Sequence, residues 1–437
     1  MILSLITFIV TILLMIILII CKPYIKLGNK ITIQTFWIAT LLGAIFTIAT
    51  LQIDISSLWT NLTAGSMNPI KILVLFISLS MISISLDELN FFSYLANKAL
   101  KLSKGNQYKI FFTIYFLIAL LTIFTSNDIV ILTFTPFIIM FSKKAKINPI
   151  PYLIMEFVNA NTYSMLFSIG NPTNIYLSSS LNISFLYYVS KMWLPTLLAG
   201  ISTLGVILLL FRKDLSKKIY NIEIEEVSLK NKVLVIINLV ILGITTIMLV
   251  ISNYISLEMW LICLVAMLIL TIILFIFSIK YKDKTYILNT YKRLPYNLIP
   301  FILSMFILVL SLKENGIVNY IQNILITLSN NNVFATGFTY TISSTLFDNV
   351  INNIPMSVLY SSILENQSEL AVFSTIIGSN IGAYLTPIGA LAGIMWMSIL
   401  KKYDVKFNFL TFIKYGIIIT PISLIFSTLG IVIMYLF

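Results

Sequence analysis

The sequence predicts an all-α polytopic membrane protein with about ten transmembrane helices and two re-entrant hairpins, arranged as two inverted repeats. Composition is the first observation behind this prediction. Of the 437 residues, 59% are hydrophobic and only 10% are charged, whereas a soluble globular chain carries about 25% charged residues. The second observation is a series of long uncharged stretches along the whole chain. The third is that the order of these stretches, with their polar motifs, occurs twice.

Composition also excludes several classes of protein. With 28 Lys+Arg and 16 Asp+Glu, the chain cannot cover a water-exposed surface, which excludes a soluble enzyme and a disordered chain. The net charge of +12 does not indicate nucleic acid, because the basic residues form short clusters between apolar stretches. The chain has no histidine, and Cys21 and Cys263 lie far apart in the sequence, so neither a metal site nor a cofactor is expected.

The predicted crossings are apolar stretches near the length of about 20 residues that a bilayer core of about 30 Å requires. The positive-inside rule then places the basic clusters between them on the cytoplasmic face and both termini outside. The predicted crossings are residues 2–20, 31–53, 68–86, 152–190, 192–211, 233–252, 259–279, 294–312, 370–400 and 410–436.

Two further uncharged stretches are interrupted by polar residues and are predicted to be re-entrant hairpins. Residues 109–142 are interrupted at Ser126-Asn127-Asp128, and residues 333–364 from Asp348 to Asn353. The arms on either side of the first interruption have about 16 and 14 residues and reach about 21–24 Å, which is less than a full crossing. Such backbone is tolerated in a membrane only where it faces protein or a water-filled cavity.

The two halves of the chain are predicted to be inverted repeats joined by a charged cytoplasmic linker. Each half has five predicted crossings, and an odd number inverts the second half relative to the first. Asn127 matches Asn353, and Asn161 matches Asn380, in this arrangement. The first repeat is 1–211, with a hairpin at 109–142 and a broken helix at 152–178; the linker is 212–232; the second repeat is 233–437, with a hairpin at 333–364 and a broken helix at 370–400.

Four polar interruptions of the apolar stretches form the predicted substrate site. Where a membrane helix is broken, freed N–H groups can donate to an oxyanion or hydroxyl, and freed carbonyls can hold a cation. Asparagine is abundant throughout the chain, so the clustering of Gly, Pro and Asn within six residues, found twice, carries the prediction. The predicted substrate-binding residues are Ser126, Asn127, Asn161, Gly170, Asn171, Thr173, Asn174, Asn349, Asn352, Asn353, Asn380, Thr386 and Gly389.

Asp128 and Asp348, at the two hairpin tips, are the predicted ion-coupling residues. A charge in the middle of a bilayer costs at least about 3 kcal/mol, and no Lys or Arg is placed to neutralise either carboxylate. Each must therefore be protonated, paired with a cation, or exposed to a water-filled cavity. Glu156 lies about one turn into a broken helix and is expected near the membrane interface, with a structural role.

These motifs resemble a known group of transporters. The stretches Phe124 to Pro136 and Ile169-Gly-Asn-Pro-Thr-Asn174 are similar to the ion transporter superfamily. The stretches Phe347 to Pro355 and Asn380 to Gly389 resemble most closely its arsenite efflux permease branch, which is related to dicarboxylate and citrate transporters. The carboxylate transporters have Ser-Asn-Thr at a hairpin tip, from which this chain departs at Asp128.

The resemblance implies a secondary active transporter of the cell membrane that exports arsenite or antimonite in exchange for protons. Arsenous acid is a small, largely undissociated triol near neutral pH, which suits hydrogen-bonding Asn, Thr and backbone groups. Two alternatives stay open: a sodium- or proton-coupled importer of di- or tricarboxylates such as citrate, and a cation/proton antiporter with Asp128 and Asp348 as ion ligands. An enzyme is not expected, and a channel has no need of two matched broken helices.

The expected partners follow from these hypotheses. They are a small inorganic oxyacid or carboxylate substrate, a coupling proton or sodium ion, and the lipid bilayer. A homodimer and, for an arsenite-type protein, a soluble ATPase subunit stay open. Nucleic acid is not expected, because the basic clusters follow the positive-inside rule.

Overall fold

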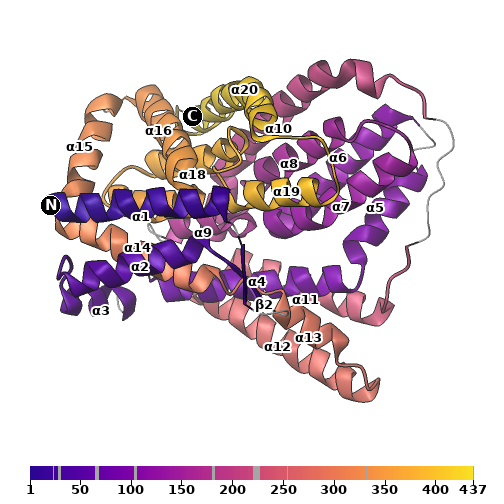
Figure 1. Cartoon of the computed structure of the whole chain (residues 1–437), viewed down its shortest axis with the longest axis horizontal. Helices are drawn as coiled ribbons and strands as arrows, with labels where there is room; N and C mark the ends of the chain where they lie inside the picture. The colour runs from indigo at the N-terminus through magenta and orange to yellow at the C-terminus, as the bar shows by residue number, and fades with distance from the viewer. Residues whose placement is uncertain are drawn as a thin grey trace.

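A computed structural model describes residues 1–22, 24–27, 31–63, 68–102, 106–179, 183–219, 227–252, 254–330 and 332–436. The described chain is helical apart from one short hairpin of strands, and its helices pack side by side into one body (Figure 1). Residues 220–226 of the predicted linker lie outside the described residues.

The first half of the chain contains a run of long helices, a helical hairpin and a broken helix. Its elements are α1 (Ile2–Cys21), β1 (Tyr24–Leu27), β2 (Ile31–Gln34), α2 (Phe36–Ala49), α3 (Ile55–Thr63), α4 (Pro69–Glu88), α5 (Phe91–Leu102), α6 (Gln107–Phe124), α7 (Asn127–Lys144), α8 (Ile150–Tyr163), the 3₁₀ turn η1 (Ser168–Gly170), α9 (Pro172–Ser179) and α10 (Phe185–Leu215).

The second half has a similar succession of elements. They are α11 (Lys232–Ile251), α12 (Met259–Lys280), α13 (Thr285–Lys292), α14 (Leu298–Glu314), α15 (Ile317–Ser329), α16 (Val333–Ile351), α17 (Asn353–Ile363), α18 (Glu369–Ile381), the 3₁₀ turn η2 (Gly382–Tyr384), α19 (Leu391–Lys402) and α20 (Phe409–Leu436). In both halves a short helix precedes a helical hairpin, which is followed by a broken helix and a long final helix.

Seven described helices are long and apolar enough to cross a membrane. The pair α14 and α15, bent by 76°, would add an eighth span. This differs from the predicted ten. α2 has only 14 residues, and the stretches 152–190 and 370–400 are divided into short helices, whereas α6, one of the seven, belongs to the first predicted hairpin. The seven are α1, α4, α6, α10, α11, α12 and α20.

The arms of the first hairpin are longer than predicted, with 18 residues each in α6 and α7. α6 begins early because the Asn106 side chain accepts a hydrogen bond from the Lys109 N–H and caps the helix. α7 continues to Lys143 and Lys144, whose positive charges are favourable in the last turn of a helix. In the second hairpin, α16 has 19 residues and α17 has 11. The re-entrant course of both hairpins stays a prediction.

One element departs from the predicted all-α fold. Strands β1 and β2 form a two-stranded antiparallel sheet between α1 and α2, with Tyr24 opposite Gln34 and Leu27 opposite Ile31. The β-branched residues of Ile31-Thr32-Ile33 favour this extended conformation over a helical start of the second predicted crossing.

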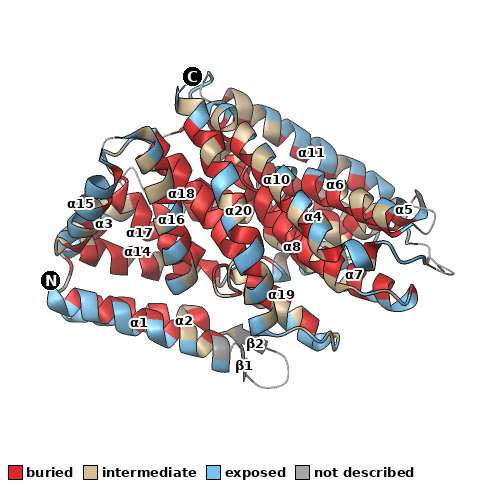
Figure 2. Ribbon diagram, turned by 90° about the horizontal axis from the view of Figure 1, so that it is seen from above, coloured by how far each residue is buried: buried red, intermediate tan, exposed pale blue. Residues whose placement is uncertain are grey.

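The broken helices lie in the centre of the body, and the long helices enclose them (Figure 2). Every residue of α8 from Pro151 to Thr162, and of α18 from Leu370 to Ile381, is buried. By contrast, α11 and α12 expose large apolar side chains such as Ile236, Ile244 and Ile272, as expected for helices that face lipid. The long final helices α10 and α20 pack against each other, as do α16 and α18.

Gly378→Ala tests the close packing of α16 against α18. A Cβ atom at position 378 would overlap the Thr341 carbonyl oxygen and the Ser344 hydroxyl, and such overpacking costs about 1–3 kcal/mol. We expect a lower melting temperature in detergent. The matched control is Gly243→Ala in α11, where a Cβ would meet nothing within 4 Å. An unchanged melting temperature for Gly378→Ala would contradict the packing described.

Candidate functional site

Both hairpin tips place an asparagine at the start of the returning helix, Asn127 in α7 and Asn353 in α17. The Asn127 amide donates to Asn161 Oδ1 at 3.1 Å. The Oδ1 atoms of Asn127 and Asn353 are buried and have no hydrogen-bond partner among the described residues. The first turn of a helix also has free backbone N–H groups. The first tip can therefore accept a hydrogen bond from a ligand and donate one to it. The second tip can accept one, but its first-turn N–H groups are occupied, because Asn353 donates to the Gly389 carbonyl and Ile354 to Asn352 Oδ1.

Asn380, at the end of α18, joins the two halves of the chain. Its amide donates to Asn174 Oδ1 at 2.6 Å, and its Oδ1 accepts from Asn171 Nδ2 and from the Ser164 hydroxyl, each at 3.0 Å. Asn174 in turn donates to the Ser164 carbonyl at 2.8 Å. The acceptors and donors of Asn380 are thus occupied within the protein. Its role in this conformation is to connect the two broken helices.

Gly170 and Thr173 lie in the same connection. The missing side chain of Gly170 lets the Ser164 carbonyl approach closely, and a Cβ there would overlap it. The Thr173 hydroxyl lies 3.3 Å from the Ser379 hydroxyl, which is a second contact between the halves. The polar residues from Gly170 to Asn174 therefore stabilise the first broken helix through backbone and amide contacts.

The second tip is held against the loop that follows η2. Asn352 has a positive φ of 76°, a conformation rare outside glycine, and its amide donates to the Ile388 carbonyl at 2.7 Å. The Asn353 N–H donates to the Gly389 carbonyl at 3.0 Å. These two contacts place the start of α17 directly beside the second broken helix.

Asn349 links the same loop to the end of α16. It accepts from the Thr386 hydroxyl at 2.7 Å and donates to the Gly382 carbonyl at 3.0 Å. Gly389 has no room for a side chain, since a Cβ would lie 2.9 Å from Asn349 Oδ1. Tip and loop form one packed unit.

Asp348 is sealed inside this unit. Its side chain is 0% exposed, and neither carboxyl oxygen has a hydrogen-bond partner among the described residues. A Cβ at Gly382 would lie only 2.6 Å from Asp348 Oδ2. An ionised carboxylate without donors or a cation is very costly in such a place. Asp348 is therefore either protonated in this conformation or ready to take a cation.

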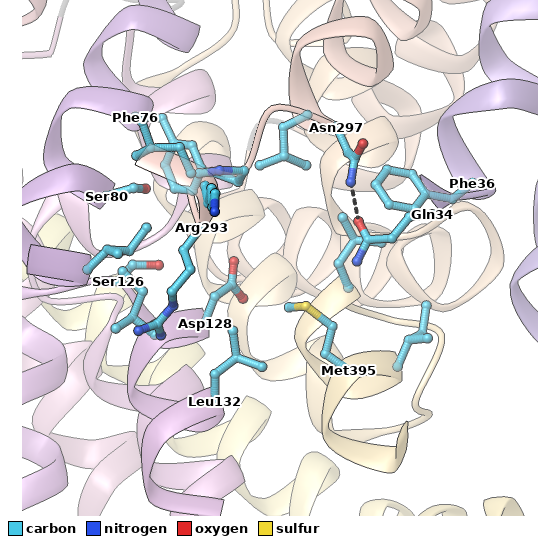
Figure 3. A pocket seen from close by; sticks show the side chains of 18 of the residues that line it. Gln34, Phe36, Phe76, Ser80, Ser126, Asp128, Leu132, Arg293, Asn297 and Met395 are labelled. Atoms are coloured by element: carbon cyan, nitrogen blue, oxygen red, sulfur yellow. Dashed lines mark hydrogen bonds between the residues drawn. The ribbon is translucent and has the colours of Figure 1, made fainter. Parts of the chain in front are cut away.

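Asp128, its counterpart at the first tip, faces a cavity of about 330 Å³ (Figure 3). Ser126, whose buried hydroxyl has no partner among the described residues, lines the same wall. The remaining walls come from α4, the end of α1, β2, the start of α2, the segment from α13 to the start of α14, and α19. The exposed residues Lys292 and Arg293 mark where the cavity meets the surface. The two predicted coupling residues thus occupy different environments, one accessible and one sealed.

Arg293 was not among the residues predicted for the site. Its guanidinium binds Asp87 Oδ2 and Glu88 Oε1, each at 2.6 Å, and Asp87 also accepts from Thr133 of α7 at 2.9 Å. Gln34 and Asn297, joined at 3.0 Å, likewise line the cavity. A basic residue at the end of a cluster that is predicted to be cytoplasmic carries no local signal for such a position, because Asp87 is 206 residues away.

The expectation for Glu156 is wrong. It was placed near the membrane interface, but its side chain is 0% exposed in the middle of α8. Its carboxyl is hydrogen-bonded to Thr135 of α7 at 2.8 Å and to the Trp396 indole of α19 at 3.2 Å. The helix position suggested an interface, whereas α7 and α19 cover that face of α8.

The predicted site residues therefore gather in two groups, and their roles in binding and coupling stay predictions. One group connects the first tip and first break to Asn380; the other surrounds Asp348, and Asp128 stands apart at the cavity. The first group is Ser126, Asn127, Asn161, Gly170, Asn171, Thr173, Asn174 and Asn380, and the second is Asp348, Asn349, Asn352, Asn353, Thr386 and Gly389.

Long apolar helices that enclose two broken helices and two polar tips define a multi-pass membrane transporter rather than an enzyme. Comparison with known proteins identifies the family: the chain belongs to the citrate transporter family CitMHS, whose model matches residues 1–373. The resemblance to the ion transporter superfamily is thereby confirmed.

Relatives and one solved structure extend over nearly the whole chain. The arsenical pump membrane protein of Escherichia coli strain K12 is 25% identical over 418 residues, which cover 90% of this chain and 92% of that protein. The arsenical pump membrane protein of Yersinia enterocolitica is 25% identical over 374 residues, 81% of this chain and 84% of that protein. The YdaH transporter of Alcanivorax borkumensis has a similar fold, with a TM-score of 0.60, 11% identity and coverage of 99% and 97%.

Thiol labelling tests the accessibility of the first tip. In a variant with Cys21 and Cys263 replaced by serine, Ser126→Cys should react with a water-soluble maleimide, because it lines the cavity. The isosteric control Ser357→Cys in α17 is buried away from the cavity and should react far more slowly. Equal labelling rates, measured by mass spectrometry, would contradict the difference between the two tips.

Proposed function

We propose that this transporter exports arsenite or antimonite across the cell membrane in exchange for protons. The observation that carries the proposal is the polar end of the cavity, where a free hydroxyl and a carboxyl meet at the first tip. Arg293 is already engaged by two carboxylates, and Lys292 lies at the exposed rim. A small neutral triol suits such a site better than a carboxylate, which requires an unpaired cation. The names of the relatives support the same substrate class.

The proposed architecture is two inverted repeats, 1–211 and 233–437, joined by the linker 212–232. The succession of hairpin, broken helix and final helix in both halves supports it. Ten crossings, with both hairpins re-entrant, place the basic cluster that ends at Arg293 in the cytoplasm. The cavity beside Asp128 then opens inward, and this conformation is the inward-facing one.

In the proposed cycle the substrate enters from the cytoplasm and binds between the tips. Its hydroxyl groups donate to the Oδ1 atoms of Asn127 and Asn353, which have no partner among the described residues, and the first N–H groups of α7 donate to its oxygens. Asp128 is reached from the cytoplasm while Asp348 is sealed. When the tips move, Asp128 becomes sealed and Asp348 becomes accessible. This change moves a proton inward as the substrate leaves.

The family description favours a second candidate, a sodium- or proton-coupled transporter of citrate or a dicarboxylate. In that case a cation beside Asp128 would have to screen the carboxylate from the substrate. A transport assay that compares arsenite with citrate and succinate separates the two candidates.

Transport in proteoliposomes tests the substrate. With an imposed proton gradient, arsenite should be concentrated against its own gradient, while succinate and citrate are not. The reason is the lack of an unpaired buried cation for a carboxylate among the described residues at the tips. Liposomes without protein are the control. Sodium-driven citrate uptake, with arsenite not transported, would refute the first candidate and support the second.

Asp128→Asn and Asp348→Asn test the coupling residues. Each change preserves size and hydrogen bonding but removes the titratable group, so we expect gradient-driven transport to be abolished. Substrate binding in detergent should survive within about tenfold, a loss under about 1.4 kcal/mol. The matched control is Asp404→Asn, an exposed residue after α19. If both variants still concentrate substrate against a gradient, coupling lies at other residues.

A further inference from the structure

We infer that Glu156 is a proton-binding site, a third carboxyl that is protonated when α7 and α19 are packed together. The inference rests on the proposed proton-coupled transport, to which it adds a residue. In the sequence it was indistinguishable from an interfacial glutamate. In the structure it is fully buried and connects three helices.

The contacts of the carboxyl come from both halves of the chain. Thr135 belongs to the returning arm of the first hairpin, and Trp396 lies 240 residues beyond Glu156, in the second broken helix. The Trp396 indole N–H donates to Oε2, and the ring also packs against Phe157 with centroids 5.3 Å apart. Among the described residues, the carboxyl has hydrogen bonds with Thr135 and Trp396 only.

The hydroxyl of Thr135 shows where a proton resides. Its oxygen lies 2.6 Å from the Ile131 carbonyl and 2.8 Å from Glu156 Oε1. A threonine hydroxyl has one hydrogen and two acceptor lone pairs. The Ile131 carbonyl has no hydrogen to donate and lies at the shorter distance, so it is the better partner for the Thr135 hydrogen. The Thr135 oxygen can then accept a hydrogen carried by the carboxyl group of Glu156.

A protonated carboxyl satisfies every contact at once. Oε1 carries the hydrogen and donates it to Thr135, while Oε2 is the carbonyl oxygen that accepts from the Trp396 indole. An ionised carboxylate would leave its charge buried with one secure donor, which is strongly unfavourable.

The site adjoins the cavity at Asp128 through the contact between α7 and α19. Asp128, Leu132 and Thr135 lie on one stripe of α7, because helical residues about two turns apart share a face. The first two line the cavity, and Thr135 lies about 10 Å along the helix from Asp128. On α19, Met395 lines the cavity and its neighbour Trp396 contacts Glu156. Figures 1 and 2 show α19 beside α7 and α8.

The charged residues on the surrounding helices lie toward the helix ends. None of them is a hydrogen-bond partner of Glu156, and the tyrosines of the adjoining elements have other partners or lie elsewhere on those elements. The groups on the elements packed around it are Asp128, Lys143 and Lys144 on α7, Lys401 and Lys402 on α19, Tyr108, Lys109 and Tyr115 on α6, Tyr187, Tyr188, Lys191, Arg212, Lys213 and Asp214 on α10, Tyr152 and Tyr163 on α8, Glu369 on α18, Tyr384 of η2, and Lys414 and Tyr415 on α20.

Movement of α7 and α19 away from α8 would release the proton, because Thr135 and Trp396 contact Glu156 from these two helices. Thr135 and Trp396 would leave the carboxyl, and water from the cavity would reach it. The O–H bond of Glu156 then breaks, the proton passes to a water molecule, and the carboxylate is solvated. In the outward-facing conformation the carboxylate takes a proton from water on the outer side before the helices close again. Asp128 and Glu156 thus titrate in succession along one face of α7.

Infrared spectroscopy of the purified protein, without substrate, tests the site. The wild type should show a carbonyl stretching band of a buried protonated carboxyl that is absent in Glu156→Gln and shifted in Trp396→Phe. Asp128→Asn and Asp348→Asn should retain this band. Glutamine mimics the protonated acid, since its NH₂ can donate to Thr135 and its oxygen can accept from Trp396. The Glu156→Gln protein should therefore keep its melting temperature.

Proton movement distinguishes a coupling role from a structural one. In proteoliposomes, Glu156→Gln should lose gradient-driven transport, and Glu156→Asp should restore part of it. The inference is overturned if the Glu156→Gln spectrum keeps all the carboxyl bands of the wild type. It is also overturned if this variant transports substrate against a gradient as the wild type does. Because the infrared band is measured without substrate, a failure of the arsenite proposal leaves this test intact.

Discussion

The absence of water from the core of a membrane is the constraint on which the rest of this structure depends. A helix that breaks there leaves N–H and C=O groups that must find partners within the protein. The chain breaks two helices, after Tyr163 and after Ile381, and encloses both with long apolar helices. Amide side chains replace the missing water: Asn174 donates to the Ser164 carbonyl and Asn349 to the Gly382 carbonyl. Asparagine is concentrated at the breaks because one amide can both donate and accept.

This constraint separates two uses of asparagine that look the same in the sequence. Asn380 and Asn174 have their donors and acceptors occupied by protein groups, and they connect the two halves. Asn127 and Asn353 keep a buried Oδ1 without a partner among the described residues. A buried acceptor without a hydrogen bond costs about 1–3 kcal/mol. Such a cost at both tips is consistent with groups kept for a ligand.

Three carboxyl groups near the breaks show how one conformation treats similar groups differently. Asp128 faces the cavity, Asp348 is sealed without a partner among the described residues, and Glu156 is sealed with two. A transporter must keep one side closed while the other is accessible, since two accessible sides would form a channel. The carboxyl groups at the two tips therefore differ in environment within one conformation, and the sequence around them cannot show which one is exposed.

The sequence by itself determined that the chain lies in a membrane, where its apolar stretches are interrupted, and which polar residues occupy the interruptions. These properties depend on local composition and on the short range of helical geometry. The observed helix ends differ from the predicted ones where a single side chain caps a helix. Asn106, for example, caps α6, which therefore begins earlier than predicted. Only the tertiary structure decided that Asn380 bonds to Asn174, that Arg293 binds Asp87 beside the cavity, and that Glu156 is buried between Thr135 and Trp396. Asn380, Arg293 and Trp396 each lie in the other half of the chain from the residue that they bind. Each pair is separated by more than 200 residues. Contacts of that range are set by how the two halves pack together, and no local pattern of residues encodes them.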